Sequence, residues 1–283
     1  MLATLGRYQI LAELGQGAMG IVYKAADPVI GRMVAIKTIS LYLPKDELAE
    51  YEARFNQEAK AAGRLNHPNI VTIYDVGKEG NVAYMAMELL EGKELRELVA
   101  SGTPLPAAQA VDVAMQVAEG LAYAHDHQVV HRDIKPANIM IVRDGLIKIT
   151  DFGIARMRQS EVKTMTGYVL GSPKYMSPEQ ITGKRADHRS DIFSLGIVIY
   201  EMLTGSVPFN GDSIHSIMYQ TVNLTPEQPS RRNPSVPEML DLIVAKALAK
   251  DMEARYPNAR ELAADLRACK EQLATPGKVS AVK

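Results

Sequence analysis

The sequence has 283 residues, of which 47% are apolar, and its 32 basic and 33 acidic side chains leave a net charge of −1. This is the composition of an ordinary globular protein, with no excess of basic residues for nucleic acid or for an anionic membrane. A single cysteine, Cys269, excludes an internal disulfide and a cysteine-based metal cage. The sequence starts without a signal-peptide pattern and contains no apolar run of the ~18 residues that span a bilayer, so we expect a cytoplasmic protein without a nucleic-acid partner or a membrane segment in this chain.

Short strand patterns dominate the first part of the chain. Turn signals such as Asp27-Pro28 and Gly80-Asn81 separate them, which predicts an antiparallel sheet built from hairpins. One helical pattern, with apolar residues at three- and four-residue steps, interrupts the strands between residues 46 and 65. The expected strands are residues 8–14, 20–26, 33–40, 70–77 and 81–90.

Helical patterns dominate after Gly92. An apolar stripe from Ala110 to Ala124 predicts a helix with one buried face, and residues 191–204 are apolar nearly all round, as in a buried core helix. Two short strands, 139–142 and 146–150, are joined by the hairpin signal Arg143-Asp144-Gly145. Further helices are expected at about 212–222, 237–250 and 258–273.

These patterns predict an α+β chain with two lobes. Its length lies near the limit of about 250–300 residues at which one hydrophobic core divides. A small, mostly antiparallel β lobe with one helix should cover residues 8–90, and a larger, mostly α-helical lobe residues 91–273, with a hinge near residues 88–92. Residues 274–283 are predicted to be a polar tail or the start of a linker.

The first chemical motif is a glycine pattern, G-x-G-x-x-G, at Gly15, Gly17 and Gly20. Glycines allow backbone amides to approach a polyphosphate, although glycine-rich hairpin turns without a ligand are also common. A dinucleotide fingerprint would open a helix after the third glycine, and a P-loop would end in Gly-Lys-Ser/Thr. A strand follows here instead. The remaining functional interpretation is a glycine-rich strand-turn-strand flap that covers phosphates.

The second motif is Lys37, at the end of an alternating apolar strand. An edge lysine that keeps a strand soluble is one interpretation. The other is a cation that reaches phosphates and needs an acidic partner to hold it, and Glu58 on the expected helix is suitably spaced for that. The sequence around this pair leaves both interpretations open.

Two further motifs, HRDIKPAN at residues 131–138 and TDFG at residues 150–153, place acidic and amide groups after helical and strand patterns. Phosphoryl transfer needs a group that orients the incoming hydroxyl and acceptors that hold a divalent metal against the phosphates. Asp133, Asn138 and Asp151 supply hard oxygen atoms suited to Mg²⁺ and to that orienting role. The alternative is a pair of polar turns, but polar turns do not explain four motifs in one order along one chain.

Six motifs therefore stand in sequence along the chain. They are Gly15-x-Gly17-x-x-Gly20-x-Val22, Val34-Ala35-Ile36-Lys37, Glu58, His131-Arg132-Asp133 with Asn138, Asp151-Phe152-Gly153 and Ser177-Pro178-Glu179. Together they resemble the protein-kinase signature set, from about Tyr8 to Leu273. The resemblance is to the bacterial eukaryotic-like (Hanks-type) serine/threonine kinases, because Lys135 in DIKPAN and phrases such as SPKYMSPEQ are similar to theirs. Two departures are Ser177, where alanine is usual, and Phe193, where many members have tryptophan.

The resemblance implies a bilobal protein-kinase fold and an ATP- and Mg²⁺-dependent protein serine/threonine kinase, with Mn²⁺ able to substitute. By the same resemblance, Asp133 orients and deprotonates the substrate hydroxyl and Lys135 steadies the γ-phosphate. Lys37 contacts the α- and β-phosphates and is held by Glu58. Asn138 and Asp151 are the implied metal ligands, and His131 is implied to pack the loop rather than to bind metal.

The resemblance also implies how the nucleotide is held. The glycine flap (Gly15, Gly17, Ala18, Gly20) should cover the phosphates. Adenine should lie between an upper and a lower apolar surface, with Met87 as gatekeeper beside the hinge backbone. The implied adenine contacts are Leu14, Val22 and Ala35 above, Met140 below, and the backbones of Glu88 and Leu90. Scaffold roles are implied for Glu179, paired with Arg255, and for Asp191, bonded to the catalytic-loop backbone.

The segment between Asp151 and Glu179 is much longer than an ordinary connection. The resemblance places Ser172 in the substrate-binding turn and makes Thr164 and Thr166 the expected autophosphorylation sites. A phosphate there would add nearly two negative charges that Arg132 is suited to pair with, which would order the segment.

Two other functions stay in view. A pseudokinase scaffold is disfavoured because all the catalytic residue types are present, and a small-molecule phosphotransferase is disfavoured by the long segment that ends at Ser177-Pro178-Glu179. Protein substrates with Ser or Thr acceptors are the expected partners. A homodimer that phosphorylates between its own copies is left open.

Overall fold

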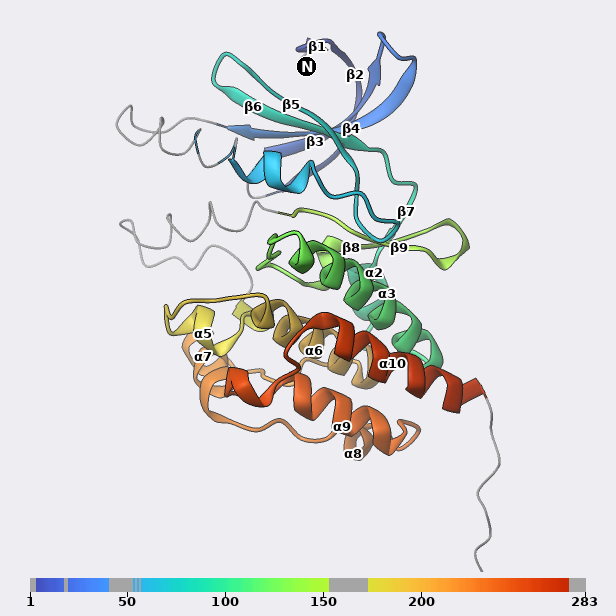
Figure 1. Cartoon of the computed structure of the whole chain (residues 1–283), viewed down its shortest axis with the longest axis vertical. Helices are drawn as coiled ribbons and strands as arrows, with labels where there is room; N and C mark the ends of the chain where they lie inside the picture. The colour runs from blue at the N-terminus through green and yellow to red at the C-terminus, as the bar shows by residue number, and fades with distance from the viewer. Residues whose placement is uncertain are drawn as a thin grey trace, which may run out of the picture.

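The structure is a computed structural model, and it describes residues 4–17, 20–40, 53, 55, 57–152 and 173–274. A sheet forms the small lobe and a group of helices forms the large lobe, as Figure 1 shows from the side. The predicted division into a mostly β lobe and a mostly α lobe is confirmed. In the described part of the chain, no helix is both long enough and apolar enough to cross a membrane.

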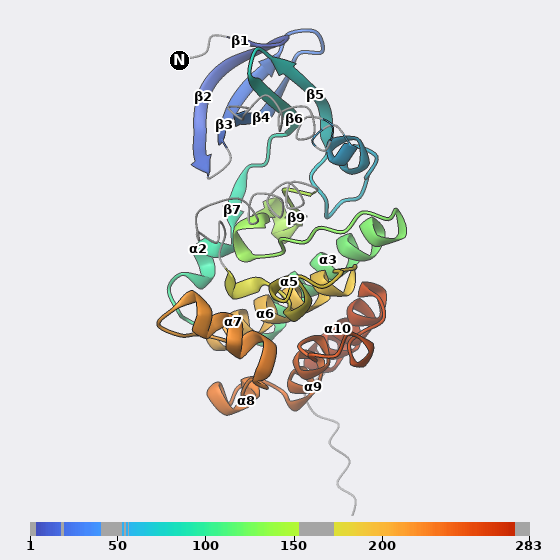
Figure 2. The same cartoon turned by 90° about the vertical axis from the view of Figure 1, so that its left-hand side faces the viewer.

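The small lobe is built on a six-stranded sheet in the order β1-β2-β3-β4-β6-β5, with antiparallel pairing throughout. Figure 2 shows the sheet above the rest of the chain. Side chains on one of its faces, including Tyr8, Ala25, Ile36 and Tyr84, are buried together. Of the strands in this sheet, β1 was not predicted, because two residues are too few to show alternation. The strands are β1 (Thr4–Leu5), β2 (Tyr8–Gly17), β3 (Gly20–Asp27), β4 (Arg32–Ser40), β5 (Ile73–Glu79) and β6 (Val82–Glu88).

The expected helix of the small lobe is present where it is described, with helical backbone through residues 57–62. Phe55 and Ala59 are buried against Ile39 of β4 and Met85 of β6, so the helix packs on the sheet through the apolar positions that predicted it. Ala62, another position of the predicted pattern, is buried as well. The remaining two, Leu48 and Tyr51, lie outside the described residues.

The large lobe surrounds α6, which is buried along nearly its whole length, as its apolar sequence predicted. The face of α3 from Ala110 to Ala124 is buried as well. Three short helices, α2, α5 and α8, were not predicted, because four or five residues hold too little of a helical period. The helices are α2 (Leu95–Val99), α3 (Ala107–Asp126), α5 (Pro178–Ile181), α6 (Arg189–Thr204), α7 (Ile214–Asn223), α8 (Pro229–Arg232), α9 (Glu238–Ala247) and α10 (Ala259–Ala274).

A second, three-stranded sheet in the order β7-β8-β9 lies between the main sheet and the helices. Its strands are β7 (Gly92–Glu94), β8 (Ile139–Val142) and β9 (Ile147–Ile149). The predicted hairpin is confirmed: Asp144 and Gly145 both take positive φ angles, 59° and 73°, in the turn between β8 and β9.

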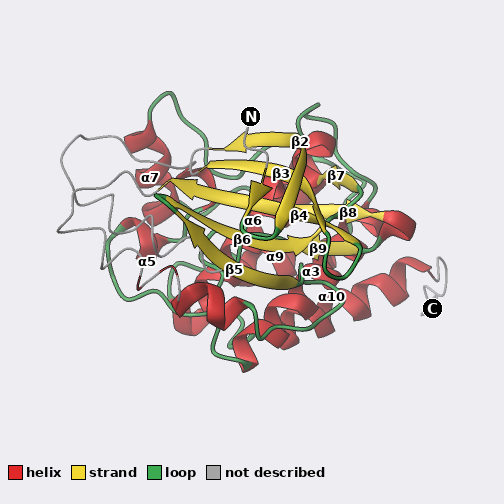
Figure 3. Ribbon diagram, turned by 90° about the horizontal axis from the view of Figure 1, so that it is seen from above, coloured by secondary structure: helices red, strands yellow, loops and turns green. Residues whose placement is uncertain are grey.

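The two lobes are joined by backbone hydrogen bonds as well as by the hinge. Val71 N donates to Ile149 O at 2.9 Å, and Ile149 N donates to Asn69 O at 2.9 Å. In Figure 3, viewed from above, the strands of the small lobe lie over the helices of the large one. The segment that follows β9 therefore starts at the junction of the lobes.

Candidate functional site

The catalytic-loop candidate, residues 131–138, is fixed by a carboxylate from the core helix α6. Asp191 is fully buried and accepts hydrogen bonds from His131 N at 2.8 Å and Arg132 N at 2.6 Å. His125 Nε2 lies 2.8 Å from the same carboxylate. Burial alone would raise the pKa of Asp191, but the bond to His125 and the charges nearby outweigh it, so the pKa is lowered. The predicted contact of Asp191 with this backbone is confirmed.

His131 holds the loop against the end of β9. Its Nε2 lies 2.8 Å from Thr150 O, and its ring packs edge-on against Phe152 at 4.6 Å between centroids. Thr150 N donates to Asn138 O at 2.9 Å, so the residue before Asp151 is bonded on both sides. His131 is thus a packing residue, as expected.

Asp133 lies at the centre of a polar cluster. Lys135 Nζ donates to its Oδ2 at 2.6 Å. Asn138 Nδ2 donates to the backbone oxygen of Asp133 at 2.7 Å and to its Oδ2 at 3.2 Å. These bonds fix the rotamer of a carboxylate that is 29% exposed and therefore accessible to a hydroxyl group from outside.

Lys37, from β4, forms an ion pair with Asp151 across the junction of the lobes. The Nζ to Oδ1 distance is 2.7 Å. Burial opposes ionisation of Asp151, yet the Lys37 charge outweighs burial and lowers the pKa of the carboxyl group, which is therefore ionised at neutral pH. The structure brings the phosphate-contact and metal-ligand candidates together.

Glu58 is half-buried on the helical segment 57–62. It lines a cavity of about 160 Å³ together with Gln57, Ala61 and residues 128–132. The helical segment and the start of the catalytic-loop candidate therefore both line this cavity. The Lys37–Glu58 pair stays a prediction.

Asn138 and Asp151 are the candidate ligands for a divalent cation. The amide nitrogen of Asn138 is committed to Asp133, which leaves its oxygen as the donor for a cation. Within the residues that the structure describes, no cluster of three or more His, Cys, Asp or Glu side chains could hold a metal alone. An amide and one ionised carboxylate fit Mg²⁺, which keeps water and takes phosphate oxygens as further ligands.

An apolar cluster lies between β3, β4 and the hinge. Ala35 and Met87 are buried in it, and Val22 and Leu90 pack against it. It also contains Val71 and Leu89, which sequence reasoning did not single out, although Val71 belongs to a predicted strand. Leu14 is 52% exposed on β2, and Met140 is half-buried on β8. Of the adenine candidates, Val22, Ala35, Met87 and Leu90 thus share one apolar cluster, and Leu14 is not part of it.

The glycine pattern belongs to the β2–β3 hairpin, where Gly15 pairs with Val22 and Gly17 with Gly20. Gly20 has φ of +152°, and a Cβ there would lie 1.8 Å from Thr38 O. The third glycine is therefore required by close packing on β4, independently of any ligand. Ala18 lies outside the described residues.

Comparison with known proteins identifies this arrangement. The family model "Protein kinase domain" matches residues 8–265. The chain belongs to the protein kinase family. Serine/threonine-protein kinase PrkC of Bacillus subtilis is 45% identical over 262 residues, covering 93% of this chain and 40% of PrkC. Serine/threonine-protein kinase PknB of Mycobacterium leprae is 43% identical over 265 residues, covering 92% of this chain and 42% of PknB.

Solved structures agree with the kinase fold. The PknI kinase domain of Mycobacterium tuberculosis has a TM-score of 0.76 and 27% identity, covering 95% of this chain and 99% of that domain. The predicted membership of the bacterial Hanks-type serine/threonine kinases is thus confirmed. The chain spans about two fifths of the length of PrkC and of PknB.

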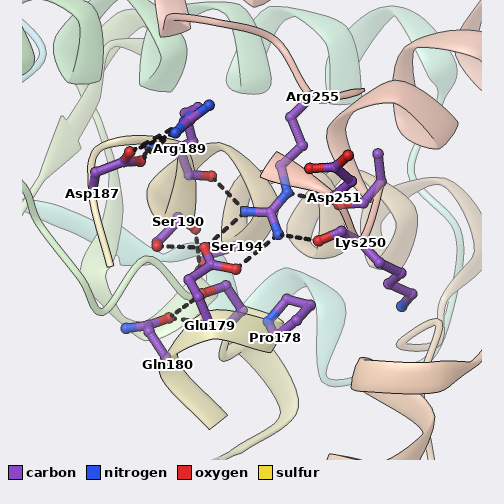
Figure 4. A network of polar contacts seen from close by, with 12 residues as sticks. Pro178, Glu179, Gln180, Asp187, Arg189, Ser190, Ser194, Lys250, Asp251 and Arg255 are labelled. Carbon is purple, nitrogen blue, oxygen red and sulfur yellow. Dashed lines mark hydrogen bonds and ion pairs between the residues drawn. The ribbon is translucent and has the colours of Figure 1, made fainter. Parts of the chain in front are cut away.

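The kinase scaffold is completed by a buried ion pair. Arg255 Nη1 and Nη2 donate to Glu179 Oε1 and Oε2, both at 2.8 Å, and Ser190 Oγ donates to the same carboxylate (Figure 4). The predicted Glu179–Arg255 pair is confirmed. Thr164, Thr166 and Ser172 lie outside the described residues.

Proposed function

We propose that this chain is an ATP-dependent protein serine/threonine kinase that transfers the γ-phosphoryl group of ATP to Ser or Thr hydroxyls of proteins. The observation that carries the proposal is that two polar groups are neighbours: the backbone of Thr150, next to Asp151, bonds to that of Asn138, and the Lys135 charge helps to lower the pKa of Asp151. One is Asp133 with Lys135 and Asn138, and the other is Asp151 with Lys37. Phosphoryl transfer is catalysed mainly by such positioning and by charge stabilisation.

Each group has a role in the proposed reaction. The substrate hydroxyl oxygen attacks the γ-phosphorus, its proton passes to Asp133, and ADP leaves. Lys135 neutralises charge on the transferred group, and Lys37, held by Glu58, neutralises charge on the α- and β-phosphates. Asn138 and Asp151 would hold Mg²⁺, which screens the phosphate charges when bound, and Mn²⁺ offers the same oxygen-preferring chemistry.

Adenine would occupy the apolar cluster at the hinge. Val22 and Ala35 would cover it from the small lobe and Met140 from below, while Leu14 would close the outer edge. Met87 would limit the depth of the pocket, and the backbones of Glu88 and Leu90 would bond the base. The burial of Ala35 and Met87 in one cluster with Val22 and Leu90 supports this placement.

The test compares wild type with Asp133→Asn after incubation with Mg·ATP and a generic acceptor protein. Asn keeps the shape of Asp133 but cannot accept the hydroxyl proton, so phosphate incorporation should fall by about a thousandfold or more. Intact mass and phosphosite mapping measure it. Equal incorporation by wild type and Asp133→Asn would place the chemistry elsewhere, and binding of ATP without transfer by wild type would favour the pseudokinase.

We propose further that autophosphorylation on Thr164 and Thr166 switches the enzyme on. Arg132 is half-buried beside Asp133, so a phosphate that pairs with its guanidinium would order the segment next to the catalytic carboxylate. Ser172 is proposed to lie in the turn that meets the acceptor peptide. Mapping should find phosphate on both threonines in wild type, and a Thr164→Ala/Thr166→Ala variant with full activity would exclude the switch.

A homodimer through the small lobe is the proposed setting for phosphorylation between copies. Val29 and Ile30, in the turn after β3, are 74% and 59% exposed, and Met33 beside them is 41% exposed. Adjacent apolar side chains of this size favour a protein contact. Val29→Asp/Ile30→Asp should shift the chain to monomer in analytical ultracentrifugation and slow autophosphorylation at low concentration. An unchanged dimer fraction would show that this surface is not the dimer interface.

We propose that the domain acts in the cytoplasm, without a nucleic-acid partner.

A further inference from the structure

Gln180, the residue after the Glu179 of the scaffold pair, reaches the catalytic loop. Its Nε2 donates to the backbone oxygen of Arg132 at 2.8 Å. On its other side, its Oε1 accepts hydrogen bonds from Ser177 N and Ser177 Oγ, both at 3.0 Å. One amide group therefore both caps the start of α5 and contacts the residue before Asp133. Figure 4 shows Gln180 beside Glu179 and Pro178.

The backbone at Arg132 needs support from outside. Its φ angle is +66°, in the left-handed region that residues other than glycine rarely adopt. Asp191 bonds its N–H, as described above, and Gln180 bonds its carbonyl oxygen. The strained residue is thus held from both sides by side chains of two different helices.

The same bond fixes the peptide unit that carries Asp133. The carbonyl end of the Arg132–Asp133 peptide accepts from Gln180, and its N–H end donates to His131 Nδ1 at 3.2 Å. Because a peptide unit is planar, bonds at both ends fix its rotation and hence the direction in which the Asp133 side chain starts. Without the Gln180 bond, one end of this unit is released.

We propose that Gln180 is a positioning residue for phosphoryl transfer, holding the Arg132 carbonyl so that Asp133 points at the substrate hydroxyl. The inference rests on the proposed kinase activity. Ser177 supports it, since its N–H and hydroxyl orient the amide so that the nitrogen faces Arg132. This gives a function to the serine that stands where alanine is usual.

Two substitutions separate the capping of α5 from the positioning of Asp133. Gln180→Glu keeps an acceptor for Ser177, because Glu serves as well as Gln in a capping box, but it has no donor for the Arg132 carbonyl. Gln180→Lys keeps a donor for that carbonyl and loses the acceptor for Ser177. A purely structural role predicts that the Glu variant resembles wild type, whereas a positioning role predicts that the Lys variant retains more activity.

The experiment measures kcat and KM for ATP on protein with matched phosphate content, established by intact mass. We expect Gln180→Glu to lower kcat about tenfold, with KM for ATP changed less than about twofold, and Gln180→Lys to retain more of kcat. Gln220→Glu is the matched control, since Gln220 also donates to a backbone oxygen, Asn210 O, and accepts from Asn210 N, away from the catalytic loop. Its kcat should stay within about twofold of wild type.

The outcomes are distinguishable. Wild-type kcat in Gln180→Glu, or a Lys variant less active than the Glu variant, would overturn the positioning role while leaving the kinase intact. If wild type transfers no more phosphate than Asp133→Asn, the proposed function fails and the inference with it. Should Gln180→Glu not fold, the comparison of Gln180→Lys with Gln180→Met decides, because only Lys keeps a donor, and equal kcat values would overturn the inference.

Discussion

Arg255 and Glu179 form an ion pair with almost no access to water, their side chains being 0% and 4% exposed. Burial would raise the pKa of Glu179, but hydrogen bonds from Arg255 and Ser190 outweigh it and lower the pKa below the usual 4.5. The stability that this group contributes is thus fully present above about pH 4.5 and is lost as pH falls through the lower, folded-state pKa.

Removal of one partner should be costly. Arg255→Met leaves the Glu179 carboxylate buried without its cation, so we expect the free energy of unfolding to fall by about 3–5 kcal/mol in denaturant titrations. The double variant Glu179→Gln/Arg255→Met should be more stable than Arg255→Met alone, because the buried charge is gone. A double variant that loses the sum of the two single effects would show that the charge is not the cause.

The sequence singled out the residues of the candidate site, but it did not indicate most of their hydrogen-bond partners. Asp133, Asn138 and Asp151 belong to short motifs, and the Glu179–Arg255 pair follows from resemblance to kinases. The bond from Gln180 to Arg132 joins residues 48 positions apart, and no local pattern marks it. Side-chain partners of this kind depend on how the elements pack.

Lys250, after α9, joins two helices of the large lobe. Its Nζ donates to Thr221 O near the end of α7 at 2.6 Å and lies 3.9 Å from the centre of the Phe209 ring. Burial, with a smaller contribution from the Arg255 charge, lowers the pKa of Lys250 to about 8. The element boundaries here were predicted within a few residues, but the burial of this lysine was not, because its sequence position resembles an exposed helix end.

The lowered pKa predicts how stability depends on pH. Between pH 8 and about pH 10.5 the unfolded chain holds a proton on Lys250 that the folded chain has lost, so the free energy of unfolding rises with pH in this range. Discounted for screening by solvent, the rise is about 1–2 kcal/mol. In denaturant titrations at pH 7.5 and 10, the free energy of unfolding should show this rise in wild type but not in Lys250→Met. The control Lys184→Met, at an exposed position, should show the same pH dependence of stability as wild type. If Lys250→Met also kept that pH dependence, the released proton would not come from Lys250.

At the scale of the whole molecule, the candidate site lies where the lobes meet. Lys148 of β9 donates to Glu88 Oε2, at the end of β6, at 2.8 Å and to Ile70 O at 3.3 Å. Glu88 Oε2 also accepts from Thr72 N at 3.3 Å. These bonds fix the strand that precedes Asp151 to the hinge, whose backbone is proposed to hydrogen-bond adenine. Two lobes were predictable from strand and helix patterns, and so was the strand that carries Lys148. The ion pair was not, because Lys148 and Glu88 are 60 positions apart and no local pattern marks them as partners.

Lys148→Met should weaken nucleotide binding more than it slows transfer. It removes the cation that fixes the hinge, while the Asp133 cluster keeps all its bonds, so we expect KM for ATP to rise about fivefold with kcat changed less than about twofold. A non-hydrolysable ATP analogue should also raise the melting temperature of the variant less than that of wild type. Lys93→Met, at an exposed position of β7 in the same sheet, is the control and should keep the wild-type KM. An unchanged KM in Lys148→Met would mean that the hinge holds its geometry without this ion pair, whereas a fall in kcat alone would place the role of Lys148 at Asp151 instead.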